Sequence, residues 1–279
     1  MALKISVMVG NLRMDVYEGM KVVRDMGVTG LHLSVGGGPF HPDKLDKAAR
    51  AKLVAHIKSL GLEVSAVSSW GGNVHLENPA TMESSVADAK KTLELAADLK
   101  CGIWQAHIGV VPRDVNDPGW ATTVAACKRI AEHGEKVGAC LAIETGPEPP
   151  IVLKRLIETV GSKTIRVNYD PANLVLWPAH FCEREKRPYN KEEALRDFQP
   201  VEGVKVIGNY VVHTHAKDAL VHEGGKRQEV PLGQGWIDWP RYVGLLREAG
   251  FNGYYAIERE VGADPVGDIR KAVGFLKTL

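Results

Sequence analysis

The sequence lacks the features that mark secreted, membrane-spanning and nucleic-acid-binding proteins. Its 279 residues include four cysteines, none of them in a C-x-x-C pair, which excludes a zinc ribbon and a disulfide framework. No apolar run approaches ~18 residues, so no segment is predicted to span a membrane. The 35 Lys and Arg residues nearly balance the 34 Asp and Glu residues, which leaves no basic field for nucleic acid.

The beginning of the chain also lacks the pattern of a secretory signal peptide. The apolar stretch from Ile5 to Val9 is short, and no small-residue cleavage site follows it. From the four scattered cysteines, which show no disulfide pattern, we expect a cytoplasmic protein. We also expect reduced thiols at Cys101, Cys127, Cys140 and Cys182.

Short apolar runs alternate with helical patterns along the whole chain. The runs are often rich in Val and Ile, as is typical of strands covered by helices on both sides. The segments between them space apolar residues at i, i+3, i+4 and i+7, as a helix with one buried face requires. The predicted strands are residues 3–9, 30–35, 63–69, 102–109, 140–145, 165–170, 210–215 and 254–260.

Eight such units of about 35 residues predict an α/β fold, a single (β/α)8 TIM-barrel domain spanning residues 1–279. The longest insertions, residues 174–199 and 216–237, follow the sixth and seventh strands. A doubly wound open sheet is the alternative. The glycine-rich dinucleotide fingerprint of such sheets is missing after the first strand, which favours the barrel.

Ionisable residues end four consecutive strands in the second half of the chain. These ends meet at one mouth of a parallel barrel. Three carboxylates and one imidazole repel one another there unless a cation lies among them. Oxygen-rich ligands with one imidazole favour Mn²⁺, our expected ion, or Mg²⁺, with Co²⁺ and Zn²⁺ as alternatives. The four residues are Glu144, Asp170, His215 and Glu258.

Other strand-end residues are candidates for contacts inside the mouth. His213 shares a face with His215, but His215 is nearer the strand end, so we interpret His213 as a hydrogen-bonded core residue. His107, at the end of the fourth strand, is a candidate hydrogen-bond partner of substrate or of a ligand. Trp70, at the end of the third, is a candidate apolar wall for a sugar ring. Packing in the core or under a loop is the alternative for both.

Four segments carry a resemblance to a known family: NYDPANL (168–174), HTHAKD (213–218), VPLGQGWIDWP (230–240) and AIERE (256–260). Through them the whole chain resembles the sugar phosphate isomerase/epimerase family of xylose-isomerase-like TIM barrels. Its members include ketose 3-epimerases, hydroxypyruvate isomerases and inosose dehydratases.

The resemblance implies roles for particular residues. It makes Glu144, Asp170, His215 and Glu258 the ligands of one divalent metal ion. It also makes Glu144 and Glu258 an acid–base pair on opposite faces of a bound sugar. Asn173 falls where some members place a substrate-binding residue. Lys217, in HAKD, is expected to contact a substrate oxygen or to pair with Asp218.

The implied activity is that of a metal-dependent sugar isomerase or epimerase. The metal ion polarises a carbonyl and stabilises an enediolate, while one glutamate removes the neighbouring proton and the other returns it. A lyase or dehydratase acting on a keto-sugar or keto-cyclitol is the alternative, since the same intermediate can lose a β-hydroxyl. The chain has Pro150 where ketose epimerases have Glu, and it lacks their Arg after the metal-binding His, where it reads Ala219-Leu220-Val221. Both departures disfavour a simple free-ketohexose 3-epimerase.

Two further hypotheses assign the protein to other functional classes. A three-zinc apurinic endonuclease needs more histidines, including one where Asn173 stands, and a DNA-binding groove. The net charge of +1 disfavours it. The second of these hypotheses is a non-catalytic barrel that binds a sugar or a metal ion. The expected partner is a small carbohydrate. A homo-oligomer is left open, because Trp177, Phe181 and Tyr189 in the predicted sixth loop are suited to cap the site or to meet another subunit.

Overall fold

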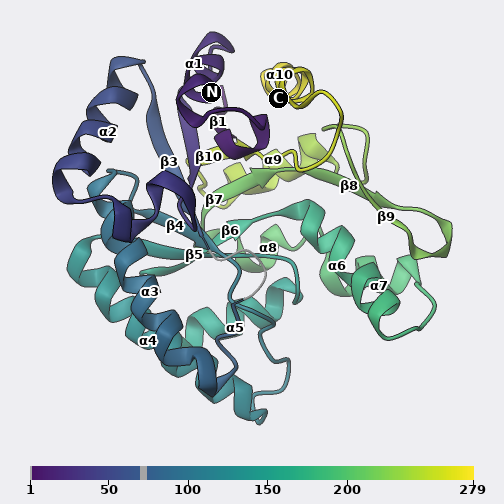
Figure 1. Ribbon diagram of the computed structural model, residues 1–279. Coiled ribbons are helices and arrows are strands. Elements are labelled where there is room, and N and C mark those ends of the chain that lie inside the picture. The colour runs from purple at the N-terminus through teal and green to yellow at the C-terminus, as the bar shows by residue number, and fades with distance from the viewer. Residues whose placement is uncertain (1, 70–73) are drawn as a thin grey trace.

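Eight parallel strands form a closed barrel in the computed structural model, which describes residues 2–69 and 74–279. Figure 1 shows the strands at the centre with helices around them. The order around the barrel follows the chain, and β10 closes it between β7 and β1. The predicted TIM barrel is therefore confirmed. The barrel strands are β1 (Lys4–Met8), β2 (Gly30–Ser34), β3 (Glu63–Ser68), β4 (Ile103–Ala106), β5 (Cys140–Glu144), β6 (Ile165–Tyr169), β7 (Val211–Ala216) and β10 (Tyr254–Ile257).

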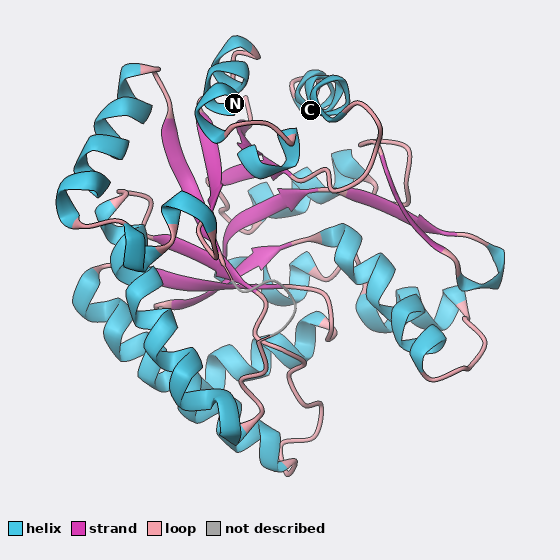
Figure 2. Ribbon diagram, viewed as in Figure 1, coloured by secondary structure: helices cyan, strands magenta, loops and turns pink. Residues whose placement is uncertain are grey.

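Helices cover the outside of the barrel (Figure 2). Several begin at a proline that follows Asn or Asp, whose side chain caps the first turn. Gly138 and Gly161 end α4 and α5 in the left-handed conformation that glycine adopts without strain. The helices are α1 (Val16–Asp25), α2 (Lys47–Ser59), α3 (Pro79–Asp98), α4 (Pro118–Val137), α5 (Pro150–Val160), α6 (Pro171–Arg184), α7 (Lys191–Phe198), α8 (Val204–Ile207), α9 (Trp239–Glu248) and α10 (Pro265–Leu276).

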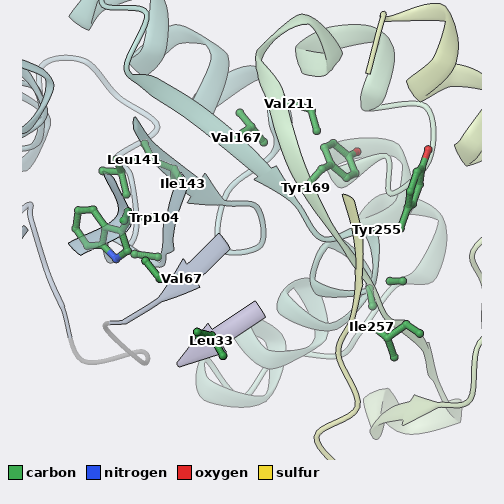
Figure 3. Packing of buried hydrophobic residues seen from close by; sticks show 14 of the residues in the cluster. Leu33, Val67, Trp104, Leu141, Ile143, Val167, Tyr169, Val211, Tyr255 and Ile257 are labelled. Carbon is green, nitrogen blue, oxygen red and sulfur yellow. The ribbon is translucent and has the colours of Figure 1, made fainter. Parts of the chain in front are cut away.

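The strands present apolar side chains to one face and polar ones to the other. Figure 3 shows buried apolar residues from successive strands, among them Leu33, Trp104 and Tyr255. They alternate with residues that face the barrel interior, as the pleat requires. Ser65 on β3 contacts both Ser6 on β1 and a side chain on β7, across the interior. The core thus lies between barrel and helices, and the interior is largely polar.

Both predicted insertions carry regular structure. Residues 174–199 were expected to form a loop with Trp177 and Phe181 on it. That expectation is wrong, because α6 continues through Pro178 to Arg184. Residues 216–237 contain the antiparallel hairpin of β8 (Asp218–Val221) and β9 (Arg227–Val230), which lies along α6 (Figure 1).

The cysteines and the helices bear on two expectations drawn from the composition. All four cysteines are free, so the predicted absence of a disulfide framework is confirmed. Within residues 2–69 and 74–279, none of the helices combines the length and the apolar character needed to cross a bilayer.

Asp218 organises the segment that carries the VPLGQGWIDWP motif. Its buried carboxylate accepts hydrogen bonds from the backbone N–H of Gly233 (2.9 Å), from that of Gly235 (3.2 Å) and from the indole of Trp239 (3.0 Å). A Cβ on Gly235 would lie 2.1 Å from Asp218 Oδ1 and 2.6 Å from the backbone oxygen of Ala219. Position 235 therefore has no room for a side chain.

We predict that Gly235→Ala lowers the free energy of unfolding by about 2–4 kcal/mol, because the added methyl meets backbone as well as the carboxylate. Gly244→Ala is the matched control. No atom lies within 4 Å of its added Cβ, and it sits inside α9, so we expect a gain of about 0.5–1 kcal/mol. Urea unfolding of both variants tests this. Equal effects of the two substitutions would contradict it.

Candidate functional site

Four side chains from four strand ends converge at the mouth of the barrel. Nδ1 of His215 lies 3.0 Å from Glu144 Oε1, 3.1 Å from Glu258 Oε2 and 3.8 Å from Asp170 Oδ2. All four side chains are at most 10% exposed. Asp170 also caps α6 with its other oxygen, which accepts from the backbone of Ala172 and Asn173. The cap fixes where this carboxylate points.

The spacing of these groups fits one metal ion. One ligand atom from each of the four residues lies within 4.8 Å of all the others. Octahedral coordination with bonds of about 2.1 Å separates ligand atoms by about 3.0 Å or 4.2 Å. Oδ2 of Asp170 is buried and has no hydrogen-bond partner among the described residues. A buried carboxylate oxygen in this position fits a metal ligand better than a structural group.

Burial and mutual charge shift the acidities of these groups in opposite directions. Burial raises the pKa of Asp170 to about 6. Burial alone would lower the pKa of His215, but the charges of Glu258 and Glu144 outweigh it and hold that pKa well above 6.5. For Glu258, burial is outweighed by the charges of His215 and Lys217, and its pKa is well below the usual range. Without a metal ion, a protonated His215 therefore counters the carboxylates.

Glu144 is surrounded by hydrogen-bond donors. Asn173 donates to its Oε1 (3.0 Å), and His107 Nε2 lies 3.2 Å from its Oε2. Gln105, on β4, also donates to Oε2. Gln105 was not predicted from the sequence, although it precedes His107 by two residues and so lies on the same face of the strand. Burial would raise the pKa of Glu144, but the charges of His107 and His215 lower it overall.

Lys217 belongs to the same cluster. Its side chain is 5% exposed, and its Nζ lies 3.2 Å from Glu258 Oε2 and donates to Glu260 as well. Pairing with Asp218, one of the two expectations for this residue, is wrong, because Asp218 instead holds the 230–240 segment. Lys217 therefore contributes a positive charge directly beside one carboxylate of the cluster.

The cluster opens into a cavity of about 950 Å³. Glu144, Glu258, His107, Asn173 and Lys217 all line it, so the structure brings together most of the predicted site residues. Trp177, on α6, adds an aromatic wall. Trp70 lies outside the described residues.

The comparisons with known proteins agree with this fold. The sequence profile described as xylose isomerase-like TIM barrel matches residues 20–279. The chain belongs to this family. The resemblance proposed from its motifs is confirmed.

Several solved structures resemble this xylose isomerase-like barrel at low sequence identity. A xylose isomerase domain protein from Planctomyces limnophilus has a TM-score of 0.79 and 24% identity, covering 99% of this chain and 96% of that one. A xylose isomerase-like TIM barrel protein from Mycobacterium smegmatis in complex with magnesium has a TM-score of 0.74 and 16% identity, covering 99% and 96%.

Two further structures of this fold carry named activities. L-ribulose 3-epimerase has a TM-score of 0.73 and 17% identity, covering 100% of this chain and 94% of that one. The probable 3-DHS dehydratase AsbF from Bacillus anthracis has a TM-score of 0.73 and 14% identity, covering 98% of both chains. At such identities the likeness shows the fold alone.

Among curated proteins, the chain is similar to Uncharacterized protein MJ1311 of Methanocaldococcus jannaschii. The two are 23% identical over 210 residues, which is 68% of this chain. The matched region spans 63% of the length of that relative.

We predict that Asp170→Asn stabilises the metal-free protein above pH 6. The folded pKa of about 6 lies above the ordinary 3.8, so the stability linked to its proton is complete below pH 3.8 and is lost as pH rises through 6. Asparagine keeps the helix cap without the charge. We expect a gain on the order of 1 kcal/mol at pH 7.5 that disappears near pH 4.

Urea unfolding in EDTA at both pH values measures this gain. Asp15→Asn is the matched control, since Asp15 caps α1 in the same way from an exposed position. A wild-type protein at least as stable as Asp170→Asn at pH 7.5 would contradict the prediction.

Proposed function

We propose that the protein is a divalent-metal-dependent sugar isomerase or epimerase that moves a proton beside a carbonyl group. The observation that carries the proposal is the convergence of Glu144, Asp170, His215 and Glu258 on one point at the floor of the cavity. The set contains two glutamates that also line the cavity, so the same side chains are suited to hold the ion and to exchange protons with a bound substrate.

The charges of the cluster favour a divalent ion. Three carboxylates that are at most 10% exposed are offset by Lys217 and by an ion of charge +2, with His215 neutral, which leaves the group close to electroneutral. When bound, such an ion acts as a Lewis acid that polarises a substrate carbonyl. Oxygen-rich ligands with one imidazole suit Mn²⁺ or Mg²⁺, and we propose Mn²⁺.

In the proposed reaction, the two glutamates transfer protons. One carboxylate takes the proton from the carbon beside the carbonyl, and the electron pair of that C–H bond enters the enediolate. The other returns a proton, to the opposite face of the same carbon for epimerisation or to the neighbouring carbon for isomerisation, in which case the hydroxyl proton also moves from one oxygen to the other. Oε1 of Glu144 faces His215, whereas its Oε2 faces His107. Ligation through Oε1 would leave Oε2 unligated on the side of His107 and Gln105, where it can exchange a proton.

The remaining cavity residues are suited to orient the substrate. We propose that His107, Asn173 and Lys217 contact its hydroxyl or carbonyl oxygens, since all three line the cavity within reach of the glutamates. Trp70 keeps its role as an expectation from sequence. The substrate class is a small carbohydrate that carries a carbonyl group.

Elimination of water is the second candidate reaction. It begins with the same proton abstraction and ends with loss of a β-hydroxyl group, so the same glutamates serve it. The similarity of the fold to that of a probable dehydratase supports elimination as a second candidate. The mass of the product separates the two, because isomerisation and epimerisation leave the substrate mass unchanged.

We predict that Glu144→Gln and Glu258→Gln each slow exchange of the substrate C–H proton with deuterated solvent by about 10²–10⁴-fold, because glutamine cannot accept the proton. Keto-sugars are incubated with Mn²⁺-loaded protein in D₂O and followed by NMR and mass spectrometry. Glu148→Gln is the matched control, a buried glutamate that lies four residues after Glu144, beyond the end of β5, and is not among the four converging residues. Full turnover by both site variants on a substrate of the wild type would refute the two-base scheme.

We predict that Mn²⁺ binds more tightly as pH rises from 6 to 7.5. The pKa of His215 is raised well above 6.5 in the metal-free protein, so its proton must leave before Nδ1 can bind an ion. Loss of one proton makes the Kd fall about tenfold per pH unit. Calorimetry in two buffers of different ionisation enthalpy measures the Kd and the released proton together. A Kd independent of pH with no proton release would contradict the assignment of His215 as a ligand.

A further inference from the structure

Three histidines lie together inside the barrel, below the carboxylate cluster. His32 on β2 is fully buried, and its ring centroid lies 5.0 Å from that of His213 and 5.3 Å from that of His215. One nitrogen from each of the three rings lies within 4.8 Å of the other two. His213 and His215 were recognised from the sequence, whereas His32 was not.

His213 already has partners for both ring nitrogens. Its Nδ1 lies 2.8 Å from Asn168 Oδ1, an acceptor, so Nδ1 carries the proton. Its Nε2 faces the hydroxyl of Ser65 at 3.4 Å. The prediction that His213 is a hydrogen-bonded core residue is confirmed. Its Nε2 faces Ser65, with no hydrogen bond to His215 among the described residues.

His215 and His32 are left with unmatched nitrogens. Within the described residues, Nε2 of His215 and both ring nitrogens of His32 are buried without a hydrogen-bond partner. An unpaired buried polar atom costs about 1–3 kcal/mol, so such atoms are rarely left unmatched. Two atoms that share one bridging water molecule lie about 4.6 Å apart, because each hydrogen bond spans about 2.8 Å. One ring nitrogen of His32 and one of His215 lie within 4.8 Å of each other, which suits such a bridge.

We propose that His32 is a positioning residue that accepts the Nε2–H of His215 through one buried water molecule. A histidine that binds a metal ion through Nδ1 must carry its proton on Nε2, and an acceptor for that proton fixes both the tautomer and the ring orientation. His32 thereby keeps the Nδ1 lone pair of His215 directed at Glu144, Asp170 and Glu258. The inference rests on the proposed metal site and assigns it a supporting residue.

A second metal ion among the three imidazoles fits the structure less well. The group contains no carboxylate, and all three rings are at most 1% exposed. A divalent charge there would be uncompensated and close to the first ion. The inference therefore requires one bound ion per chain.

Substitution of His32 tests the inference through Mn²⁺ affinity. We expect His32→Leu, which has no acceptor, to weaken Mn²⁺ binding at pH 7 by about 10–100-fold in calorimetry. We expect His32→Gln, whose amide oxygen accepts the same proton, to stay within about threefold of the wild type. Ser6→Ala is the control, since Ser6 is equally buried in the interior but bonds to Ser65. Circular dichroism establishes that each variant is folded.

NMR of ¹⁵N-histidine-labelled wild-type protein gives a readout that does not depend on the variants. In the Mg²⁺-loaded form we expect His215 to carry its proton on Nε2, with slow exchange, and one nitrogen of His32 to be a hydrogen-bond acceptor. A proton on Nδ1 of His215 in the loaded protein overturns the inference. The inference is also overturned if His32→Leu binds Mn²⁺ as tightly as the wild type, or if His32→Gln binds it as weakly as His32→Leu. Binding of two ions per chain overturns it as well.

Failure of the proposed function is distinguishable from failure of this inference. If the wild type binds no divalent ion, the metal site is refuted, and the metal-free NMR spectrum then decides about His32 alone. In that form we expect Nε2–H of His215 to be protected from exchange and His32 to be its acceptor. An Nε2–H that exchanges with solvent as fast as that of an exposed histidine refutes the inference.

Discussion

Three carboxylates share one buried position in this protein, and each is costly to keep ionised away from water. Every group around them reduces that cost. His215 lies between the three, Lys217 lies beside Glu258, and Gln105 and Asn173 donate to Glu144. Such a cluster weakens the fold unless a cation completes it. This is the physical reason to regard it as a functional site and not as a structural one.

The barrel makes this concentration of charge possible. Its apolar side chains lie mainly between strands and helices, where Trp104 and Tyr169 are fully buried, so the interior is free to be polar. The closed sheet fixes the strand ends relative to one another, and the β5, β6, β7 and β10 ends deliver one ligand each. The helix cap at Asp170 and the carboxylate network of Asp218 then hold the flanking loops. The rigid scaffold thus holds the carboxylates close together although their like charges repel one another.

The sequence predicted the barrel and the four converging residues for one shared reason. A buried strand is mostly apolar, so an ionisable residue at its end is conspicuous, and parallel closure brings such ends together. Gln105 and His32 were missed because a single neutral polar residue within a strand carries no such signal. Whether it faces the interior depends on the pleat, and whether it meets a ligand depends on strands distant in the sequence.

The errors arose where tertiary packing outweighs local signals. Residues 174–199 were expected to form a loop, yet α6 continues through Pro178 while packed against the β8–β9 hairpin. The partner of Lys217 depended on where the loop after β10 places Glu260, which no spacing in the sequence reveals.

The central claim is that one divalent cation is held by side chains from these four strand ends. Anomalous diffraction at the manganese edge, from crystals grown with Mn²⁺, tests it directly. The account predicts a single strong peak in contact with carboxylate oxygens of Glu144, Asp170 and Glu258 and with Nδ1 of His215. A map with no peak there, or with the ion bound elsewhere, would contradict it.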